Sequence, residues 1–381
     1  MNFRSYEIKD ICKIKSGKRL PKGTDFSEKP TKHKYIRARD IKNGKIDGSD
    51  LGYISEETQK KIERYIVNTN DIIITIAGTI GEVALVSKKF DGVNLTENAV
   101  RLTEFSKDVC PEFLAYILKS PERKEYMEQV AGGSAQPKLG IYKIEAIKVD
   151  LPDIQIQHKI ADILSAYDDL IENNQKQIKL LEEAAQRLYK EWFVDLRFPG
   201  HENTKIVDGV PEGWSRGLLK ELISVNYGKD HKKAPDDGNI PVYGSGGLMR
   251  KCNKSLFSGE AVLIPRKGSL NNIMYVDETF WTVDTMFYAT MKQPHTAVFV
   301  YFFVKAFDMY SMNIGAAVPS MTAKILDAMD VVIPDKETLE KFDKYAKVYF
   351  NKIKTLQGQN EQLKTARDLL LPKFMSGEVE V

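Results

Sequence analysis

Residues 133–153 of this 381-residue chain are GSAQPKLGIYKIEAIKVDLPD, and residues 315–335 are GAAVPSMTAKILDAMDVVIPD. Gly, Ala, Pro, Ala, Val and the closing Pro-Asp recur in the same order and at the same spacing. When the comparison is extended without gaps, residues 133–192 and 315–374 share 15 identical positions. The period is far too long for a solenoid, so the sequence predicts two similar domains produced by duplication, as in a covalent pseudo-dimer.

Each copy begins with a β-rich part and ends with a long helix. Runs rich in Ile and Val, bounded by Gly, Asn and Asp, predict the strands. A helix is expected over residues 111–130, just before the first repeated stretch. The predicted fold class is therefore α+β, with two β-rich domains in tandem repeat and two long helices that pair as an antiparallel coiled coil between them.

The long helices show a coiled-coil pattern. Apolar or small residues recur alternately three and four positions apart, which is the spacing of a heptad seam. An ordinary amphipathic helix packed on its own domain is the alternative interpretation. Each seam contains an asparagine, and a buried asparagine fixes the register of a coiled coil at some cost in stability. The predicted seam residues are Ile160, Leu164, Tyr167, Ile171, Asn174, Ile178, Leu181, Leu188, Phe342, Tyr349, Ile353, Leu356, Asn360, Leu363 and Leu370.

These patterns divide the chain into four segments. The first β-rich domain is expected over residues 1–152 and the first long helix over 153–198. A linker and the second β-rich domain follow over 199–334, and the second helix with a C-terminal tail occupies 335–381. Gly358 lies inside that second helix, where it costs about 1 kcal/mol relative to Ala and indicates a bend or a close helix approach.

Composition limits the possible surroundings of the protein. The three cysteines are scattered and odd in number, which indicates reduced thiols. No apolar run has the length that crosses a bilayer, and the N-terminus has no apolar core of a signal peptide. We therefore expect a cytoplasmic protein without a membrane partner. The net charge is only +3, but residues 1–45 contain 14 Lys and Arg against 5 Asp and Glu, so charge is concentrated locally.

The sequence contains none of the motifs that would indicate an enzyme. Walker A, HExxH, CxxC and GxSxG patterns are missing, as is the Pro-Pro motif of amino-methyltransferases. The five histidines are isolated, so no metal site is predicted. VYGSGG (242–247) faintly resembles a methyltransferase glycine loop, but a turn that places Tyr243 and Ser245 on a surface is the favoured interpretation. The balance favours a protein that binds and organises other molecules.

Basic residues cluster in the loops between the expected strands of both copies. Lys and Arg at this density suit contacts with phosphates, and Arg can also recognise guanine. A solvated basic surface is the alternative for any single residue. The candidate DNA contacts are Lys15, Lys18, Arg19, Lys34, Arg37, Arg39, Lys42, Lys229, Lys232, Lys233, Tyr243, Ser245, Arg250, Lys251, Arg266 and Lys267.

One of these clusters depends on the local fold. If KYIRARDI (34–41) is a strand, Arg37 and Arg39 share one face, opposite Ile36 and Ala38. Two arginines on one exposed face would be good candidates for DNA recognition. Either could instead pair with Asp40 or Glu28.

Several of these stretches resemble the specificity subunit of type I restriction-modification systems over essentially the whole chain. They are DIQIQHKIADILSAYDDLIENNQKQIKLLEEAAQRLYKEWF (153–193), GVPEGW (209–214), IPVYGSGG (240–247) and LLLPKFMSGEV (369–379). By that resemblance, the β-rich parts are two target recognition domains, each for one half of a bipartite site in double-stranded DNA. The two helices would set the separation of the half-sites.

The resemblance also implies partners and cofactors. The chain would be non-catalytic, bind no cofactor or metal, and hold two methyltransferase subunits that use S-adenosylmethionine. Restriction subunits that use ATP and Mg would join the same complex. Three other functions remain open: a stand-alone pseudo-dimeric DNA-binding regulator, a coiled-coil adaptor for which the basic clusters would be incidental, and an unrecognised nuclease or methyltransferase.

Overall fold

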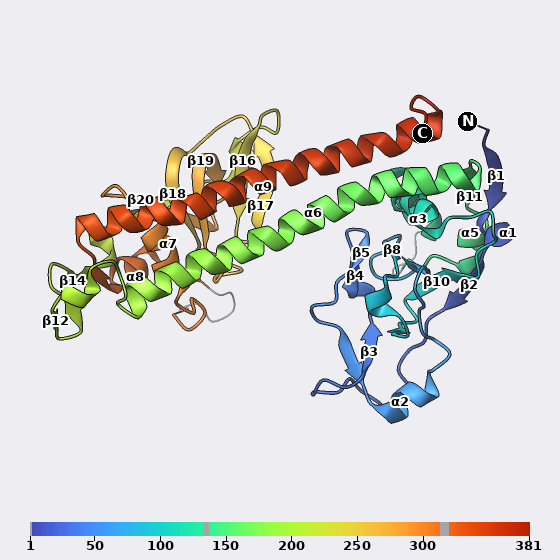
Figure 1. The fold of residues 1–381 in the computed structure, drawn as a ribbon, viewed down its shortest axis with the longest axis horizontal. Coiled ribbons are helices and arrows are strands. Elements are labelled where there is room, and N and C mark those ends of the chain that lie inside the picture. The colour runs from blue at the N-terminus through green and yellow to red at the C-terminus, as the bar shows by residue number, and fades with distance from the viewer. Residues whose placement is uncertain (1, 133–136, 313–319) are drawn as a thin grey trace. The chain divides into compact units, whose positions relative to one another are not determined.

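The computed structural model describes residues 2–132, 137–312 and 320–381, and contacts divide the chain into two units (Figure 1). Unit 1 comprises Met1–Glu172 and Asn360–Val381, and unit 2 comprises Asn173–Gln359. The two long helices are α6 (Ile154–Tyr189, 36 residues) and α9 (Lys336–Ser376, 41 residues). Each unit therefore contains one β-rich part and a portion of both long helices, whereas the sequence-based division gave each helix a segment of its own.

Unit 1 is built around a four-stranded antiparallel sheet. The strands of unit 1 are β1 (Arg4–Glu7), β2 (Lys13–Ser16), β3 (His33–Ile36), β4 (Ile41–Lys42), β5 (Lys45–Ile46), β6 (Gly52–Ile54), β7 (Ile72–Thr75), β8 (Val83–Leu85), β9 (Asn94–Leu95), β10 (Ala99–Thr103) and β11 (Lys148–Leu151). The sheet has the order β2-β10-β7-β8. Because side chains alternate along a strand, Ile72 and Ile74 of β7 enter one apolar cluster and Ile73 enters another on the opposite face.

Short helices complete unit 1. They are α1 (Ile8–Ile11), η1 (Ala38–Asp40), α2 (Glu56–Lys61), η2 (Lys88–Phe90), α3 (Pro111–Lys119), α4 (Pro121–Ala131) and α5 (Ile141–Glu145). The prediction of a single helix over residues 111–130 is wrong, because the helix is interrupted at Ser120. Pro121 cannot continue a helix, and it restricts the residue before it to an extended conformation. The Ser120 hydroxyl then caps α4 by accepting a hydrogen bond from the Arg123 amide.

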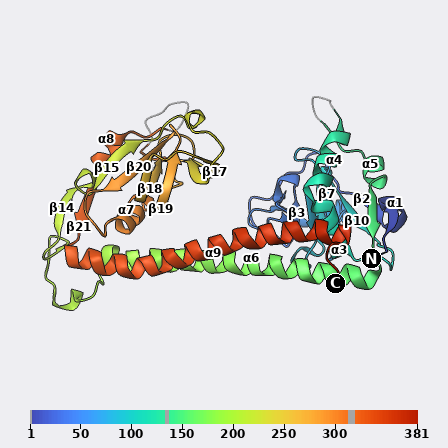
Figure 2. The same cartoon turned by 90° about the horizontal axis from the view of Figure 1, so that it is seen from above.

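Unit 2 contains a larger sheet of six strands. The strands of unit 2 are β12 (Ile206–Val207), β13 (Val210–Pro211), β14 (Ser215–Leu218), β15 (Ile223–Tyr227), β16 (Ile240–Gly244), β17 (Gly247–Cys252), β18 (Phe257–Pro265), β19 (Met274–Thr282), β20 (Met286–Met291) and β21 (Asp330–Ile333). The helices of unit 2 are η3 (Lys190–Val194), η4 (His201–Asn203), η5 (Leu219–Glu221), η6 (His231–Lys233), α7 (Ala297–Lys305) and α8 (Ala323–Asp327). Helix α7 packs against β18 and β19 (Figure 2).

The two units repeat one architecture. The sheet order β2-β10-β7-β8 of unit 1 corresponds to β15-β20-β18-β19 in unit 2, and all these neighbours are antiparallel. The pair β1-β11 likewise corresponds to β14-β21. The repeated stretch supplies α5 and β11 in unit 1, and α8 and β21 in unit 2. Residues 133–136 and 315–319 lie outside the described part of the chain. The expected α+β fold with a tandem repeat is confirmed.

Within each unit, the portions of the two long helices run antiparallel. In unit 1 the beginning of α6, with Ile160 and Leu164, shares a core with Phe374 near the end of α9. In unit 2 the end of α6 packs on the beginning of α9, and the rings of Trp192, in η3 just beyond α6, and Phe342 lie 5.8 Å apart. All predicted seam residues are buried or partly buried, including Asn174 and Asn360. Helix α9 continues through Gly358, and a Cβ there would meet nothing within 4 Å, so the expected close helix approach is wrong.

Candidate nucleic-acid interface

Several of the predicted basic residues of unit 1 are paired with carboxylates. Lys15 forms an ion pair with Glu104, and Lys13 pairs with the same carboxylate. Hydrogen bonds from these two lysines lower the pKa of Glu104 to about 2. Arg19 Nε lies 2.6 Å from a Glu97 oxygen. Lys42 similarly pairs with Asp47 at 2.8 Å. These pairs lie at the surface, where an ion pair is worth about 0–1 kcal/mol, so a phosphate could replace the carboxylate.

Arg37 is different because its guanidinium is largely buried. The strand expected over residues 34–41 is wrong beyond Ile36, where the chain turns into the short helix η1. This turn brings Asp40 back to Arg37, whose Nε and Nη2 each donate to one carboxylate oxygen at 2.9 Å. The Asp40 side chain is only 6% exposed. Arg37 is therefore a structural partner of Asp40, the alternative left open by the sequence.

Arg39 does not share a free face with Arg37. Its side chain is 67% exposed, and its Nη2 lies 3.3 Å from an oxygen of the exposed Asp50. Lys18 and Lys34 have no carboxylate partner among the described residues, although Lys18 Nζ lies 5.7 Å from the centre of the Tyr65 ring. Lys18 is exposed and Lys34 is partly buried. Only some of the basic residues predicted as DNA contacts in unit 1 are therefore available to a ligand.

Unit 2 leaves more of its predicted cations available. Lys229, Lys232, Lys233, Lys251 and Lys267 are all exposed, and none has a carboxylate partner in the described part of the chain.

Arg250 is the exception in unit 2. It pairs with Asp236, and its Nη2 also donates to the Ala234 carbonyl at 2.8 Å. The Arg250 guanidinium thus fixes the loop that follows η6 instead of facing solvent. Its pairing leaves the five exposed lysines as the available charge among the predicted residues of this region, together with Arg266.

The glycine-containing stretch at 242–247 forms the predicted turn, between β16 and β17. Tyr243 is partly buried rather than on an open surface, and its hydroxyl donates to Glu278. Burial, helped by that carboxylate, raises the pKa of Tyr243. The Ser245 carbonyl accepts a 2.9 Å hydrogen bond from Asn272 Nδ2, which joins this turn to the loop after β18.

Backbone hydrogen bonds bring three of the predicted residues together in unit 2. The Lys229 amide donates to the Thr282 carbonyl at 2.9 Å, and the Arg266 amide donates to the Thr285 carbonyl at 2.9 Å. Lys267 follows directly on Arg266. The short connection from β19 to β20 therefore holds the ends of β15 and β18 beside each other.

Arg266 is held on aromatic rings. Its guanidinium carbon lies 5.3 Å from the centre of the Tyr227 ring and 5.6 Å from that of Phe287. Such cation–π contacts orient the guanidinium without using its hydrogen-bond donors. Nη1 donates to the Asp284 carbonyl at 3.2 Å, and the buried Nε has no hydrogen-bond partner among the described residues. Arg266 thus keeps unused donor capacity.

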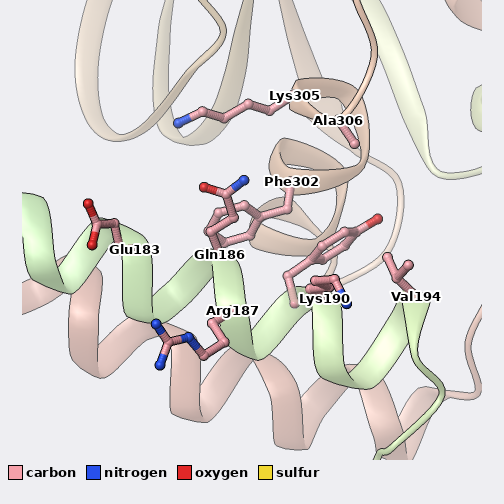
Figure 3. A pocket seen from close by; sticks show the side chains of 9 residues that line it. Glu183, Gln186, Arg187, Lys190, Val194, Phe302, Lys305 and Ala306 are labelled. Atoms are coloured by element: carbon pink, nitrogen blue, oxygen red, sulfur yellow. The ribbon is translucent and has the colours of Figure 1, made fainter.

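A separate hollow of about 500 Å³ lies between α6 and α7 of unit 2 (Figure 3). The rings of Tyr189 and Phe302 stack 5.5 Å apart at its wall. Of the cations that line it, Lys190 pairs with Asp195 and Lys305 donates to the Tyr301 hydroxyl. Its lining includes no Ser, Cys or His. The described residues also contain no group of three His, Cys, Asp or Glu placed to hold a metal ion.

Two Gly-Lys pairs, Gly17-Lys18 and Gly228-Lys229, occupy the same place in the two units, and the sequence alone predicted no structural role for them. Each follows the first strand of its four-stranded arrangement, β2 or β15. In both units the glycine amide donates to the neighbouring strand: Gly17 to the Ala99 carbonyl at 3.1 Å and Gly228 to the Met286 carbonyl at 3.0 Å. The signal in the sequence was the recurrence of the pair at the same point of both copies.

Comparisons with known proteins agree with this two-unit organisation. The family model of the type I restriction modification DNA specificity domain matches residues 2–183 and 211–365. The MjaIX type I restriction enzyme specificity subunit of Methanocaldococcus jannaschii is 26% identical over 370 residues, which cover 86% of this chain and 82% of that protein. The HindI specificity subunit of Haemophilus influenzae is 22% identical over 479 residues, which cover 99% of this chain and 100% of that protein.

A solved structure shares the fold. The crystal structure of a type I restriction-modification system S subunit from M. genitalium aligns with a TM-score of 0.61 and 19% sequence identity. The alignment covers 98% of this chain and 96% of that one. Among the described residues, no helix combines the length and the apolar character needed to cross a bilayer.

Proposed function

The chain belongs to the family defined by the type I restriction modification DNA specificity domain, and we propose that it is the DNA-recognition subunit of such a system. The observation that carries the proposal is that the family model matches both halves of the chain, and that each half folds around the same antiparallel sheet. Each unit would recognise one half of a bipartite target in double-stranded DNA. The subunit would itself be non-catalytic.

We propose a smaller set of DNA contacts than the sequence predicts. Among the predicted contacts, Lys18 in unit 1 and the five exposed lysines of unit 2 have side chains without a carboxylate partner in the described ranges. We place Arg266 with them because its guanidinium is oriented by stacking. Arg37 and Arg250 are assigned to structural roles, since their guanidinium groups are bound within the fold.

The partners follow from the function. We propose that the chain assembles with methyltransferase and restriction subunits, and that two methyltransferase subunits bind each chain. S-adenosylmethionine, ATP and Mg would be held by those partners and not by this chain. Native mass spectrometry of the reconstituted complex gives the stoichiometry, and a single methyltransferase subunit per chain would contradict this part of the proposal.

Methylome sequencing tests the proposed function directly. Cells that contain the methyltransferase subunits should methylate adenine in a bipartite motif only when this chain is present. Lys232→Gln with Lys233→Gln should reduce methylation, because two positive charges that attract DNA are lost. A methylated motif that does not depend on the chain would overturn the proposal, as would turnover on DNA by the purified chain alone.

A stand-alone regulator and a coiled-coil adaptor would give different results in the same experiments. A stand-alone regulator would bind its site tightly without methyltransferase subunits, whereas the assembly proposal predicts weak binding by the isolated chain. For a coiled-coil adaptor, the double lysine variant would leave DNA affinity unchanged.

A further inference from the structure

The internal repeat allows a comparison of equivalent positions within one chain. Lys18 follows β2 and Lys229 follows β15, and these strands occupy the same place in their sheets. The Lys18 amide donates to the Leu95 carbonyl at 2.8 Å, and the Lys229 amide donates to the Thr282 carbonyl at 2.9 Å. The two lysines are therefore structurally equivalent, although most of the sequence around them differs.

The glycine before each lysine is required by a close backbone contact. A Cβ on Gly17 would lie 2.0 Å from the Thr96 carbonyl oxygen, and one on Gly228 would lie 2.0 Å from the Val283 carbonyl oxygen. No other residue fits at either position without moving the backbone. The end of β2 in unit 1 therefore lies in close contact with the loop that precedes β10, and the end of β15 in unit 2 lies in close contact with the loop that precedes β20.

The carbonyl group of each lysine is fixed as well, by different side chains. The Tyr35 hydroxyl donates to the Lys18 carbonyl at 2.6 Å. In unit 2 the Trp281 indole Nε1 donates to the Lys229 carbonyl at 3.1 Å. The backbone of each lysine is held on both sides, while its exposed side chain has no carboxylate partner in the described ranges. A fixed backbone with an ammonium group that lacks a carboxylate partner suits a contact with a phosphate.

The adjacent strand ends differ between the units. After β7, the Ile76 amide donates to the Asn98 carbonyl at 2.8 Å, just as the Arg266 amide after β18 donates to the Thr285 carbonyl. Arg266 is therefore the equivalent of Ile76, which is buried. The cross-strand pair beneath this position also differs between the units. Tyr227 opposite Phe287, the pair that contacts Arg266 in unit 2, corresponds to Ser16 opposite Val100 in unit 1.

The isolated β-bridges confirm this alignment of the two units. Ala77 bridges to Lys138 in unit 1, and Lys267 bridges to Ser320 in unit 2. In unit 1 the lysine of this bridge is Lys138, from the repeated stretch, whereas in unit 2 it is Lys267, from the strand end after β18. A different segment therefore contributes the positive charge at this place in each unit. The backbone framework is the same and the side chains presented on it are not.

On the premise that the chain recognises DNA as proposed above, we infer that different residues contact the DNA phosphates and the DNA bases. Lys18 and Lys229 are equivalent phosphate contacts that serve both units without regard to sequence. In unit 2 the strand end after β18 recognises bases, and Arg266 is the specificity-determining residue of this unit. A guanidinium fork can bind O6 and N7 of guanine, whereas Ile76 offers no such group.

The phosphate contacts are tested by salt dependence in the complete complex with its methyltransferase subunits. Lys18→Gln and Lys229→Gln are compared with Lys205→Gln, which removes an exposed lysine just before β12. DNA affinity is measured between about 50 and 200 mM salt, and the slope of log K against log salt should fall by about 0.9 for each of the first two variants. Their methylated motif should stay unchanged. A slope equal to that of Lys205→Gln, or an altered motif, would overturn this role.

Arg266 is tested by the identity of the methylated motif. Arg266→Gln and Arg266→Lys should relax one position of one half-site by about 5- to 150-fold in discrimination, and leave the other half-site unchanged. Arg266→Lys keeps the charge but lacks the fork, so relaxation in this variant separates base recognition from charge. Uniform weakening on all sequences would overturn the assignment. If the wild-type complex showed no sequence-specific binding, the proposed function itself would fail, which is a distinguishable result.

Discussion

The Tyr116 hydroxyl, on α3, donates a 2.7 Å hydrogen bond to Asp168 Oδ2, on the long helix α6. Arg367 of α9 pairs with the other oxygen of the same carboxylate. Asp168 thus links a helix of the β-rich part to both long helices within unit 1, and its side chain is only 19% exposed. The carboxylate therefore fixes how this part of unit 1 is held on its helical support.

Asp168→Ala should destabilise unit 1 by roughly 2–3 kcal/mol, because it leaves the Tyr116 hydroxyl without its acceptor and removes one of the two carboxylates that pair with Arg367. Asp169→Ala is the matched control: it removes an exposed neighbouring carboxylate and should cost less than about 0.5 kcal/mol. Chemical unfolding of both variants measures the difference. Equal stability of the two variants would show that Asp168 has no linking role.

Lys119 gives unit 1 a predicted pH dependence. Burial lowers the pKa of Lys119 to about 8, with Asp168 opposing the shift and Arg367 and Lys45 adding to it. Between about pH 8 and the ordinary lysine value of 10.5, the unfolded chain holds this proton and the folded chain does not. Stability contributed by this residue therefore rises with pH across that window.

Lys119→Met removes the titrating group. Its stability relative to the wild-type chain should be highest below pH 8, where the wild-type chain holds a buried charge. Its advantage should shrink by about 1–3 kcal/mol as the pH rises to 10. Unfolding midpoints of both proteins, measured at several pH values, provide the comparison. Parallel pH profiles would mean that Lys119 is solvated in the folded protein.

The fold was predictable because its signals are periodic. The three-and-four spacing from Ile160 onwards indicates α6, and the repeat at an offset of 182 predicts that a second unit resembles the first. The break at Ser120 was missed because the apolar pattern continues across it. A proline at position 121 was the available signal.

The site was less predictable, because the partners of its charges lie far away in the sequence. Lys15 pairs with Glu104 and Arg19 with Glu97, contacts that only the folding of β2 beside β10 creates. The Gly17 contact is equally non-local, since the obstructing carbonyl belongs to Thr96. Composition can indicate a basic surface, but it cannot show which charges the fold neutralises.

Arg37 and Arg39 should respond differently to substitution. Arg37→Ala removes both guanidinium hydrogen bonds from the buried Asp40 carboxylate and leaves it with the longer 4.0 Å ion pair to Arg39 Nε, so it should cost about 3–5 kcal/mol in unfolding free energy. Arg39→Ala removes an exposed side chain and should cost less than about 0.5 kcal/mol. Thermal or urea unfolding distinguishes the two. An Arg37→Ala protein with wild-type stability but weakened DNA binding would restore Arg37 as a DNA contact.

Glycine-to-alanine substitutions should have opposite signs at two positions of unit 2. Gly228→Ala places a Cβ 2.0 Å from the Val283 carbonyl oxygen, so the backbone must move, at a cost of at least about 2 kcal/mol. Gly358→Ala meets nothing within 4 Å in the middle of α9 and should stabilise the protein by about 1 kcal/mol.

The unfolding free energies of these two variants test whether the Gly-Lys backbone is a fixed element. Gly17→Ala should behave like Gly228→Ala, since its Cβ would meet the Thr96 carbonyl at the same distance. If Gly17→Ala and Gly228→Ala were both as stable as the wild-type chain, the loops before β10 and β20 would be free to move. The lysines that follow would then lack a fixed backbone, and their equivalence would no longer support a common contact with DNA.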